Sequence, residues 1–128
     1  MTNRAPVPVA SYSQAVAVGE TIYLAGQGGF EASTRKLVGG GIGDQTRQAF
    51  RNLSEVIHAA GGTLDDLVSL RVYLAEDAEF EGMNEVYGEF FSPPYPARTT
   101  VAAGLGPGMR VEIEGIAVLG CRSPEAPA

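Results

Sequence analysis

Cysteine, histidine, long apolar runs and positive charge are all scarce in this 128-residue chain. The single cysteine, Cys121, excludes an internal disulfide and suits a reducing compartment. No apolar run approaches the roughly 20 residues of a membrane-spanning helix, and the first residues lack the basic start and apolar block of a secretory signal. The net charge of −6 argues against broad nucleic-acid binding, which needs a basic surface. We therefore expect a cytoplasmic protein that binds neither membranes nor nucleic acid.

What the chain does contain is the composition of one ordinary globular domain. Apolar residues make up 45% of it and charged residues 19%, and a chain of this length can bury a modest single core. We expect one domain over residues 1–128, with its core within about residues 10–119. Residues 1–9 and 120–128 are expected to be extended termini, with a frayed tail from Arg122.

The first part of the chain predicts paired strands. Residues 12–18 and 21–27 favour strands, and Gly19 opens the two-residue link between them. This link favours a type II′ hairpin turn, because glycine takes the positive φ of the first turn position at low cost. A further short strand is expected within residues 30–38. The glycine-rich segment 39–43 lacks the Gly-Lys-Ser/Thr sequence of a phosphate-binding loop, and we interpret it as a flexible connection.

Two amphipathic helices and a strand follow. Asp44 is the expected N-cap of the first helix and Gly61 its stop, because apolar residues recur between them at helical spacing: Ala49, Phe50, Leu53, Val56, Ile57 and Ala60. Residues 67–74 alternate as a strand, with an apolar face of Val68, Leu70, Val72 and Leu74. Asp77 is expected to cap a second helix that ends near Phe91, with a buried stripe of Phe80, Met83, Tyr87, Phe90 and Phe91.

The last two strands, within residues 96–103 and 110–116, have a distinctive charge pattern. Alternate side chains of a strand share one face. If the Gly/Pro segment between the strands makes a hairpin, one sheet face carries guanidinium and carboxylate groups side by side, from Arg98, Arg110, Glu112 and Glu114. A solvated face usually mixes Lys and Glu, whereas this one concentrates Arg and Glu at the strand centres. The pattern indicates a functional surface.

The order of strands, helix, strand, helix and strands predicts an α+β fold with two helices on one face of the sheet. The opposite face is expected to carry the side chains of Arg71, Arg98, Arg110, Glu112 and Glu114. A single two-layer domain leaves that face in water, whereas association with copies of the same chain buries part of it. We therefore expect an oligomer with clefts between its subunits.

Motifs along the chain resemble those of the RidA/YjgF family. They occur in family order over about residues 10–119, and they include Tyr12-Ser13-Gln14-Ala15, Asn84-Glu85-Val86-Tyr87, Pro96-Ala97-Arg98 and Val111-Glu112-Ile113-Glu114-Gly115. The resemblance implies a chorismate mutase-like fold and a homotrimer with sites between subunits. It also implies hydrolytic deamination of small carboxylate-bearing enamines and imines, such as 2-aminoacrylate and 2-iminobutyrate, to 2-keto acids and ammonia. No metal or cofactor is implied.

The resemblance also assigns roles to individual residues. Arg98 matches the family arginine that holds the substrate carboxylate, and Glu112 matches the acid that orients the attacking water. Thr100 stands where many members have cysteine, so a thiol nucleophile is not required in this chain. Three further positions match pocket residues of the family: Tyr12, Gly26 and Asn84. The chemistry is consistent, because an arginine fork pairs with a carboxylate through two hydrogen bonds and a general base contributes about 10²–10⁴ in rate.

Other interpretations of the same residues stay open. Arg98 and Glu112 can instead form an ion pair between subunits, and Asn84 can serve as a cap or loop clamp. The family has also been described as endoribonucleases and translation inhibitors, but His58 is the only histidine, and no Lys/Arg stripe with interleaved aromatics is present. A non-catalytic sensor of small acids can use the same arginine. Two turns also depart from the family, at Ala10-Ser11 and at Arg35, where the family has Gly-Pro and glycine.

Overall fold

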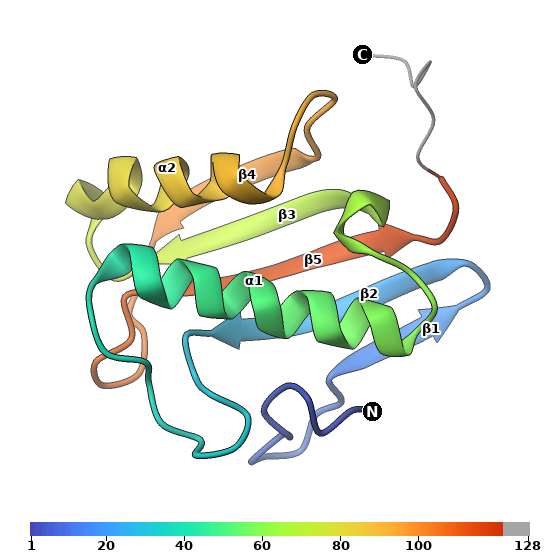
Figure 1. Ribbon diagram of the computed structural model, residues 1–128, viewed down its shortest axis with the longest axis horizontal. Helices are drawn as coiled ribbons and strands as arrows, with labels where there is room; N and C mark the ends of the chain where they lie inside the picture. Colours follow the sequence, from blue (N-terminus) through green and yellow to red (C-terminus); the bar gives the residue numbers. More distant parts are fainter. Residues whose placement is uncertain (122–128) are drawn as a thin grey trace.

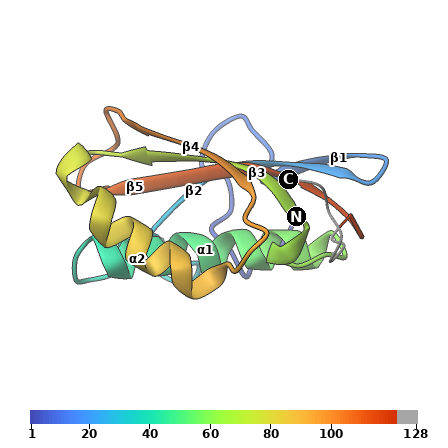
Figure 2. The same cartoon turned by 90° about the horizontal axis from the view of Figure 1, so that it is seen from above.

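Two α-helices cover one face of a five-stranded sheet and leave the other face open (Figures 1 and 2). A computed structural model describes residues 1–121 of the protein, so the predicted frayed tail lies outside the described residues. The elements are β1 (Ala15–Val18), β2 (Thr21–Gly28), α1 (Ile42–Ala59), β3 (Leu67–Leu74), α2 (Phe80–Phe90), β4 (Ala97–Ala102) and β5 (Val111–Val118), with 3₁₀ turns at Leu64–Asp66 and Asp77–Glu79. The predicted α+β class with two helices on one face is confirmed.

The strand order is β1-β2-β5-β3-β4, so the predicted hairpin between the last two strands is wrong. β3 lies between β4 and β5, pairing in parallel with β4 and antiparallel with β5. The physical reason is burial. Three residues of β5 are fully buried (Val111, Ile113 and Ala117), which suits a central strand, whereas β4 has no fully buried residue and suits an edge. The eight-residue connection between β4 and β5 is long enough to pass β3.

The core lies between the helices and one face of the sheet. Side chains alternate along β3 and β5, and those that face the helices are Leu70, Val72, Leu74, Val111, Ile113 and Ala117. They pack on the predicted stripe of α1, in which Ala49, Phe50, Leu53, Val56 and Ile57 are buried. Val68 was predicted on the apolar face but is 37% exposed, because the β3–β5 register shifts between Leu67 and Ser69.

Several element boundaries differ from the sequence prediction. α1 begins at Ile42 with Gly41 as N-cap, so Asp44 lies in the first turn, where its negative charge favours the helix dipole. α2 begins at Phe80, because the residues from Asp77 form a separate 3₁₀ turn. β1 begins at Ala15 rather than at residue 12.

Two predicted turns are confirmed by their backbone angles. Gly19, in the β1–β2 link, has φ of +58°, and Gly61, after α1, has φ of +97°.

The strand expected within residues 30–38 is reduced to one bridge between Phe30 and Leu37. Arg35 in this segment has φ of +60°, a left-handed conformation that favours glycine. This agrees with the resemblance, in which the family has glycine at this position.

Candidate active site

Arg98 lies on the helix-covered face of the sheet. It is the register partner of Leu70, whose side chain is buried under the helices. Its Nη1 donates a hydrogen bond of 2.8 Å to Asn84 Oδ1 on α2. The guanidinium carbon lies 4.4 Å from the ring centre of Tyr87 and 5.4 Å from that of Phe80, which are cation–π distances. The guanidinium is therefore held against α2 by two rings and one amide.

A cavity of about 460 Å³ opens beside this guanidinium, and we call it the Arg98 pocket. Its lining residues are Asn84, Tyr87, Gly88, Tyr95, Pro96 and Arg98. Among the described residues only Asn84 accepts a hydrogen bond from Arg98, so the remaining guanidinium N–H groups are available to a ligand. A small carboxylate suits this pocket, because a guanidinium binds it through two parallel hydrogen bonds.

Glu112 lies on the opposite, open face of the sheet. It is half-buried on β5, with Tyr73 as its register partner on β3 and Glu114 two residues away on the same face. Gly26 on β2 makes room for its carboxylate, because a Cβ at Gly26 would lie only 2.8 Å from Glu112 Oε2. The glycine singled out by the family resemblance is therefore adjacent to the acid.

The surroundings of Glu112 make its carboxylate more basic. Burial raises the pKa of Glu112 above its ordinary value, and the charge of Glu114 raises it further. The hydroxyl of Tyr73 donates a hydrogen bond to Glu114 Oε1 rather than to Glu112. That bond raises the pKa of Tyr73, and burial adds to the effect. A carboxylate with a raised pKa is better suited to accept a proton near neutral pH.

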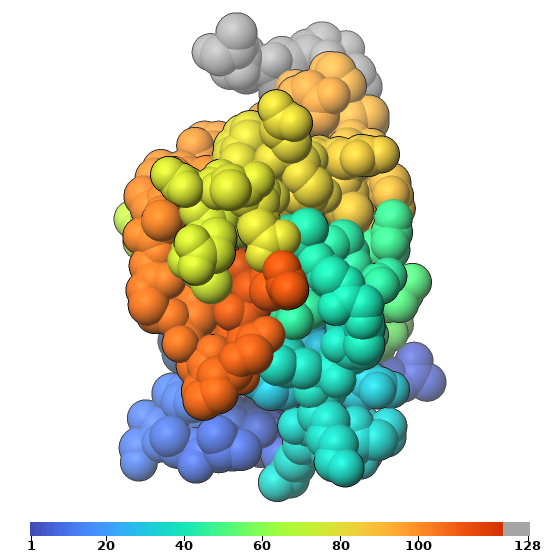
Figure 3. Space-filling view, turned by 90° about the vertical axis from the view of Figure 1, so that its left-hand side faces the viewer, coloured from blue at the N-terminus to red at the C-terminus, as the bar shows by residue number. Residues whose placement is uncertain are grey.

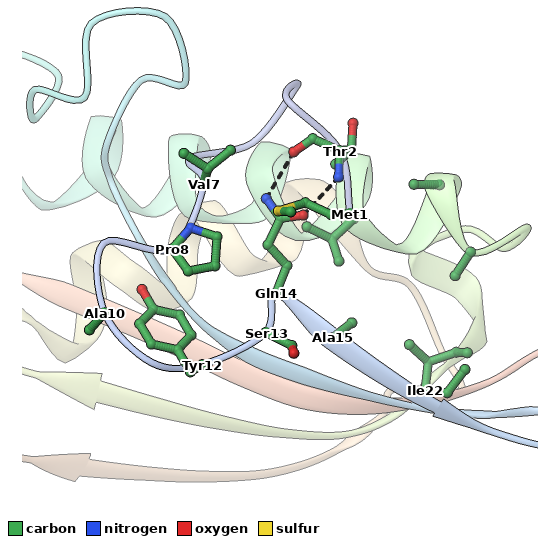
Figure 4. A pocket seen from close by; sticks show the side chains of 14 residues that line it. Met1, Thr2, Val7, Pro8, Ala10, Tyr12, Ser13, Gln14, Ala15 and Ile22 are labelled. Atoms are coloured by element: carbon green, nitrogen blue, oxygen red, sulfur yellow. Dashed lines mark hydrogen bonds between the residues drawn. The ribbon is translucent and has the colours of Figure 1, made fainter.

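The remaining two predicted site residues, Thr100 and Tyr12, lie in different places. Thr100 follows Arg98 by two residues on the same face of β4 and is half-buried, so it is close to the Arg98 pocket. Tyr12 is 53% exposed and lines a separate hollow of about 590 Å³ beneath the N-terminal segment (Figure 4). Gln14 holds that segment in place. Its Oε1 accepts a hydrogen bond from Thr2 N, and its Nε2 donates to Thr2 O and Pro6 O.

Within one chain the six predicted residues therefore occupy three places: the Arg98 pocket, the Gly26–Glu112 pair and the hollow at Tyr12. The prediction that Arg98 and Glu112 share the open face is wrong. Alternation correctly predicts that Arg98 and Thr100 share one face of β4, but the hairpin pattern places Val101 on the core face. Val101 is 44% exposed, because it lies on the face of β4 opposite to Arg98, where no helix covers the sheet.

Two buried amides fix the strand ends near Glu112. Gln45 Oε1 accepts from Arg110 N and its Nε2 donates to Gly108 O, which ties the loop before β5 to the start of α1. Figure 3 shows this orange loop against the teal start of α1. Asn52 Nδ2 donates to Gly28 O and Phe30 O, which fixes the end of β2. α1 thereby holds both strands that form the Glu112 site.

His58, Cys121 and Arg110 lie outside the Arg98 pocket. His58 and Cys121 are exposed, and Arg110 pairs with Glu79 at 2.6 Å. Residues 1–121 contain no group of three His, Cys, Asp or Glu side chains that could hold a metal ion. None of the described helices is long and apolar enough to cross a membrane.

Sequence reasoning missed Tyr87, Phe80 and Tyr73 as neighbours of the site. Tyr87 and Phe80 were expected only in the apolar stripe of α2, yet both rings contact Arg98. A signal was available, because Tyr87 follows Asn84 by three residues and therefore shares its helix face. No sequence signal marks Tyr73, whose position beside Glu112 depends on strand pairing.

The chain is similar to known proteins over nearly its whole length. Residues 2–119 match the family model described as endoribonuclease L-PSP. A 2-iminobutanoate/2-iminopropanoate deaminase of Dermatophagoides farinae is 44% identical over 92% of this chain and 93% of its own. The Homo sapiens protein of the same name is 40% identical over 93% of this chain and 88% of its own.

Solved structures show the same fold. RidA from an Antarctic Psychrobacter bacterium superposes with a TM-score of 0.89 at 42% identity, over 93% of this chain and 97% of that one. E. coli TdcF with bound serine superposes with a TM-score of 0.87 at 31% identity, over 96% of this chain and 97% of that one.

Proposed function

Because the chain belongs to the endoribonuclease L-PSP family, the family of RidA, we propose that it is a 2-iminobutanoate/2-iminopropanoate deaminase. The observation that carries the proposal is the 40–44% identity to deaminases over 92–93% of the chain. The Arg98 pocket supports it, since these substrates carry a carboxylate.

The site residues suggest how the reaction proceeds. Arg98 binds the substrate carboxylate. A structural relative, E. coli TdcF, was solved with bound serine, a small molecule that also carries a carboxylate. Glu112 orients a water molecule and takes one of its protons while the oxygen attacks the imine carbon. The resulting carbinolamine loses ammonia when the nitrogen has been protonated, and a 2-keto acid is left. Every atom comes from substrate and water, so the balanced reaction requires only positioning and proton transfer.

These residues require more than one subunit. Arg98 and Glu112 project from opposite faces of one sheet, so one substrate meets both only if a second copy contributes. The open face suits such a contact, because it exposes apolar side chains of β1 and β2, including Val16, Val18 and Tyr23. We propose a homotrimer in which the Arg98 pocket of one subunit faces Glu112 and Tyr12 of another. Light scattering should give about three times the mass of one chain.

The activity is tested by coupling the protein to a threonine or serine dehydratase, which releases the unstable enamine. The protein should accelerate the appearance of 2-keto acid and ammonia, and Arg98→Ala, prepared identically, should not. Equal rates with and without the protein would contradict the proposed function. A cytoplasmic location, suggested by the single cysteine, can be tested by cell fractionation.

A second candidate function is binding of small acids without turnover. The Arg98 pocket supports it, because binding a carboxylate needs the arginine but not Glu112. Steady-state ammonia release distinguishes the two, because a sensor binds the acid and releases none. The family description also names an endoribonuclease. The only histidine, His58, is exposed on α1 away from the pocket, and nothing in residues 1–121 favours this activity.

A further inference from the structure

The hydroxyl of Tyr87 is a buried polar group without a partner. Tyr87 is 5% exposed, and within residues 1–121 its oxygen is the only buried side-chain nitrogen or oxygen atom that makes no hydrogen bond. A buried hydroxyl without a hydrogen bond destabilises the folded protein, so native structures keep few of them and each needs a reason.

The position of this hydroxyl is fixed by the core. The ring of Tyr87 packs edge-on against Phe50, with centroids 5.7 Å apart, and lies 4.7 Å from the ring of Phe91. The guanidinium of Arg98 lies over the same ring. Tyr87 is therefore rigid, and it lines the Arg98 pocket together with Asn84 and Tyr95.

The hydroxyl is kept protonated and so remains a donor. Burial raises the pKa of Tyr87, and the nearby charge of Arg98 opposes this only in part. The charged or titratable groups that act on it are Arg98 on β4 and Tyr95 in the segment before β4. A donor beside a guanidinium needs an acceptor, and a negatively charged one is attracted by both.

We propose that the Tyr87 hydroxyl donates a hydrogen bond to the ligand carboxylate that Arg98 binds. The inference rests on the proposed function and adds a binding residue to it. Arg98 supplies the charge and the fork, while Tyr87 supplies a donor from a rigid core position. The carboxylate has enough acceptor sites for both, since two oxygens offer about four lone pairs.

This role predicts two effects of opposite sign. Tyr87→Phe removes the hydroxyl and keeps the ring, so the free protein loses an unpaired buried group and should unfold at a higher temperature. The same substitution removes a hydrogen bond to a charged ligand and should weaken its binding about 10- to 100-fold. A hydroxyl that merely holds a buried water has the reverse signature, because its removal lowers stability and leaves ligand binding unchanged.

The experiment combines calorimetric titration of 2-oxobutanoate with thermal unfolding of the free protein. His58→Ala is the control, because His58 is exposed on α1 and does not line the Arg98 pocket. His58→Ala should bind within about twofold of the parent protein. Arg98→Ala serves as the reference for lost binding.

The outcomes separate this inference from the proposed function. Weaker binding and higher thermal stability in Tyr87→Phe, with His58→Ala unchanged, support the role of the hydroxyl. If Arg98→Ala loses binding while Tyr87→Phe binds like the parent, the hydroxyl assignment is overturned and the carboxylate clamp stands. If Arg98→Ala itself binds like the parent, both are overturned.

Discussion

Arg98 and Glu112 point to opposite faces of the sheet, on strands separated by β3. Arg98 packs under α2 against Tyr87, whereas Glu112 lies on the open face beside Gly26. An ion pair between these two residues of one chain is therefore excluded by geometry. If both act on one substrate, each must come from a different subunit.

Complementation between inactive variants tests this arrangement. Arg98→Ala retains Glu112, and Glu112→Gln retains Arg98, so co-expressed mixed trimers should contain some complete sites. Random mixing makes about a quarter of the sites complete, and ammonia release should recover to that level relative to the parent. Each variant alone provides the baseline. Absence of recovery in verified mixed trimers would mean that both residues act from the same chain.

Substitution of Arg98 should affect substrate binding. Arg98→Lys keeps the charge but loses the planar fork and the hydrogen bond to Asn84. Losing one charge-assisted hydrogen bond costs about 1.5–3 kcal/mol, or roughly 10- to 150-fold in kcat/KM. Arg98→Ala should be worse, because the carboxylate then has no cationic partner. If both variants instead lose trimer mass but bind 2-oxobutanoate normally, Arg98 is an interfacial residue.

Glu112→Gln should separate turnover from binding and should change the pH dependence of stability. Without the base, kcat should fall about 10²-fold or more, while affinity for 2-oxobutanoate stays near the parent value. The pKa of Glu112 is raised in the folded protein, so its contribution to stability is present below the unfolded pKa and lost as pH rises through the folded pKa. Glu112→Gln should therefore be more stable than the parent near neutral pH.

Urea denaturation at several pH values checks the sign of this effect. The stability gain of Glu112→Gln should disappear below about pH 4, where the parent carboxyl is also neutral. A gain that grows as the pH falls would contradict the raised pKa.

Gly26→Ala should impair catalysis through Glu112. The added methyl would lie 2.8 Å from Glu112 Oε2 and must displace the carboxylate. We expect kcat to fall about tenfold or more, with little change in the affinity for 2-oxobutanoate. Gly39→Ala is a suitable control, because a Cβ there meets no atom within 4 Å. Unchanged turnover in Gly26→Ala would remove the evidence that Glu112 must keep this position.

His58→Ala and Cys121→Ser should leave activity within about twofold of the parent. Both side chains are exposed and neither lines the Arg98 pocket. A tenfold loss of deaminase activity in either variant, with unfolding temperature unchanged, would mean that the active site is not the one assigned to Arg98 and Glu112.

Local periodicity in the sequence was sufficient for most elements. The predicted strand at residues 67–74 matches β3 residue for residue, and the apolar stripe of α1 is buried as expected. These patterns succeed because the side-chain period of an element depends on its own backbone. The candidate site residues came from motifs, and their identities did not require a structure.

Tertiary structure alone decided how those residues are arranged. Alternation shows that Arg98 and Thr100 share a face of β4, but only pairing with β3 shows that this face lies under α2. An edge strand buries few side chains, so its sequence carries little information about which face is inward. The contact between Gly26 and Glu112 joins residues far apart in the chain, and the contact between Arg98 and Tyr87 joins an edge strand to a helix. Such contacts depend on strand order and on helix packing across the sheet, which no local pattern encodes.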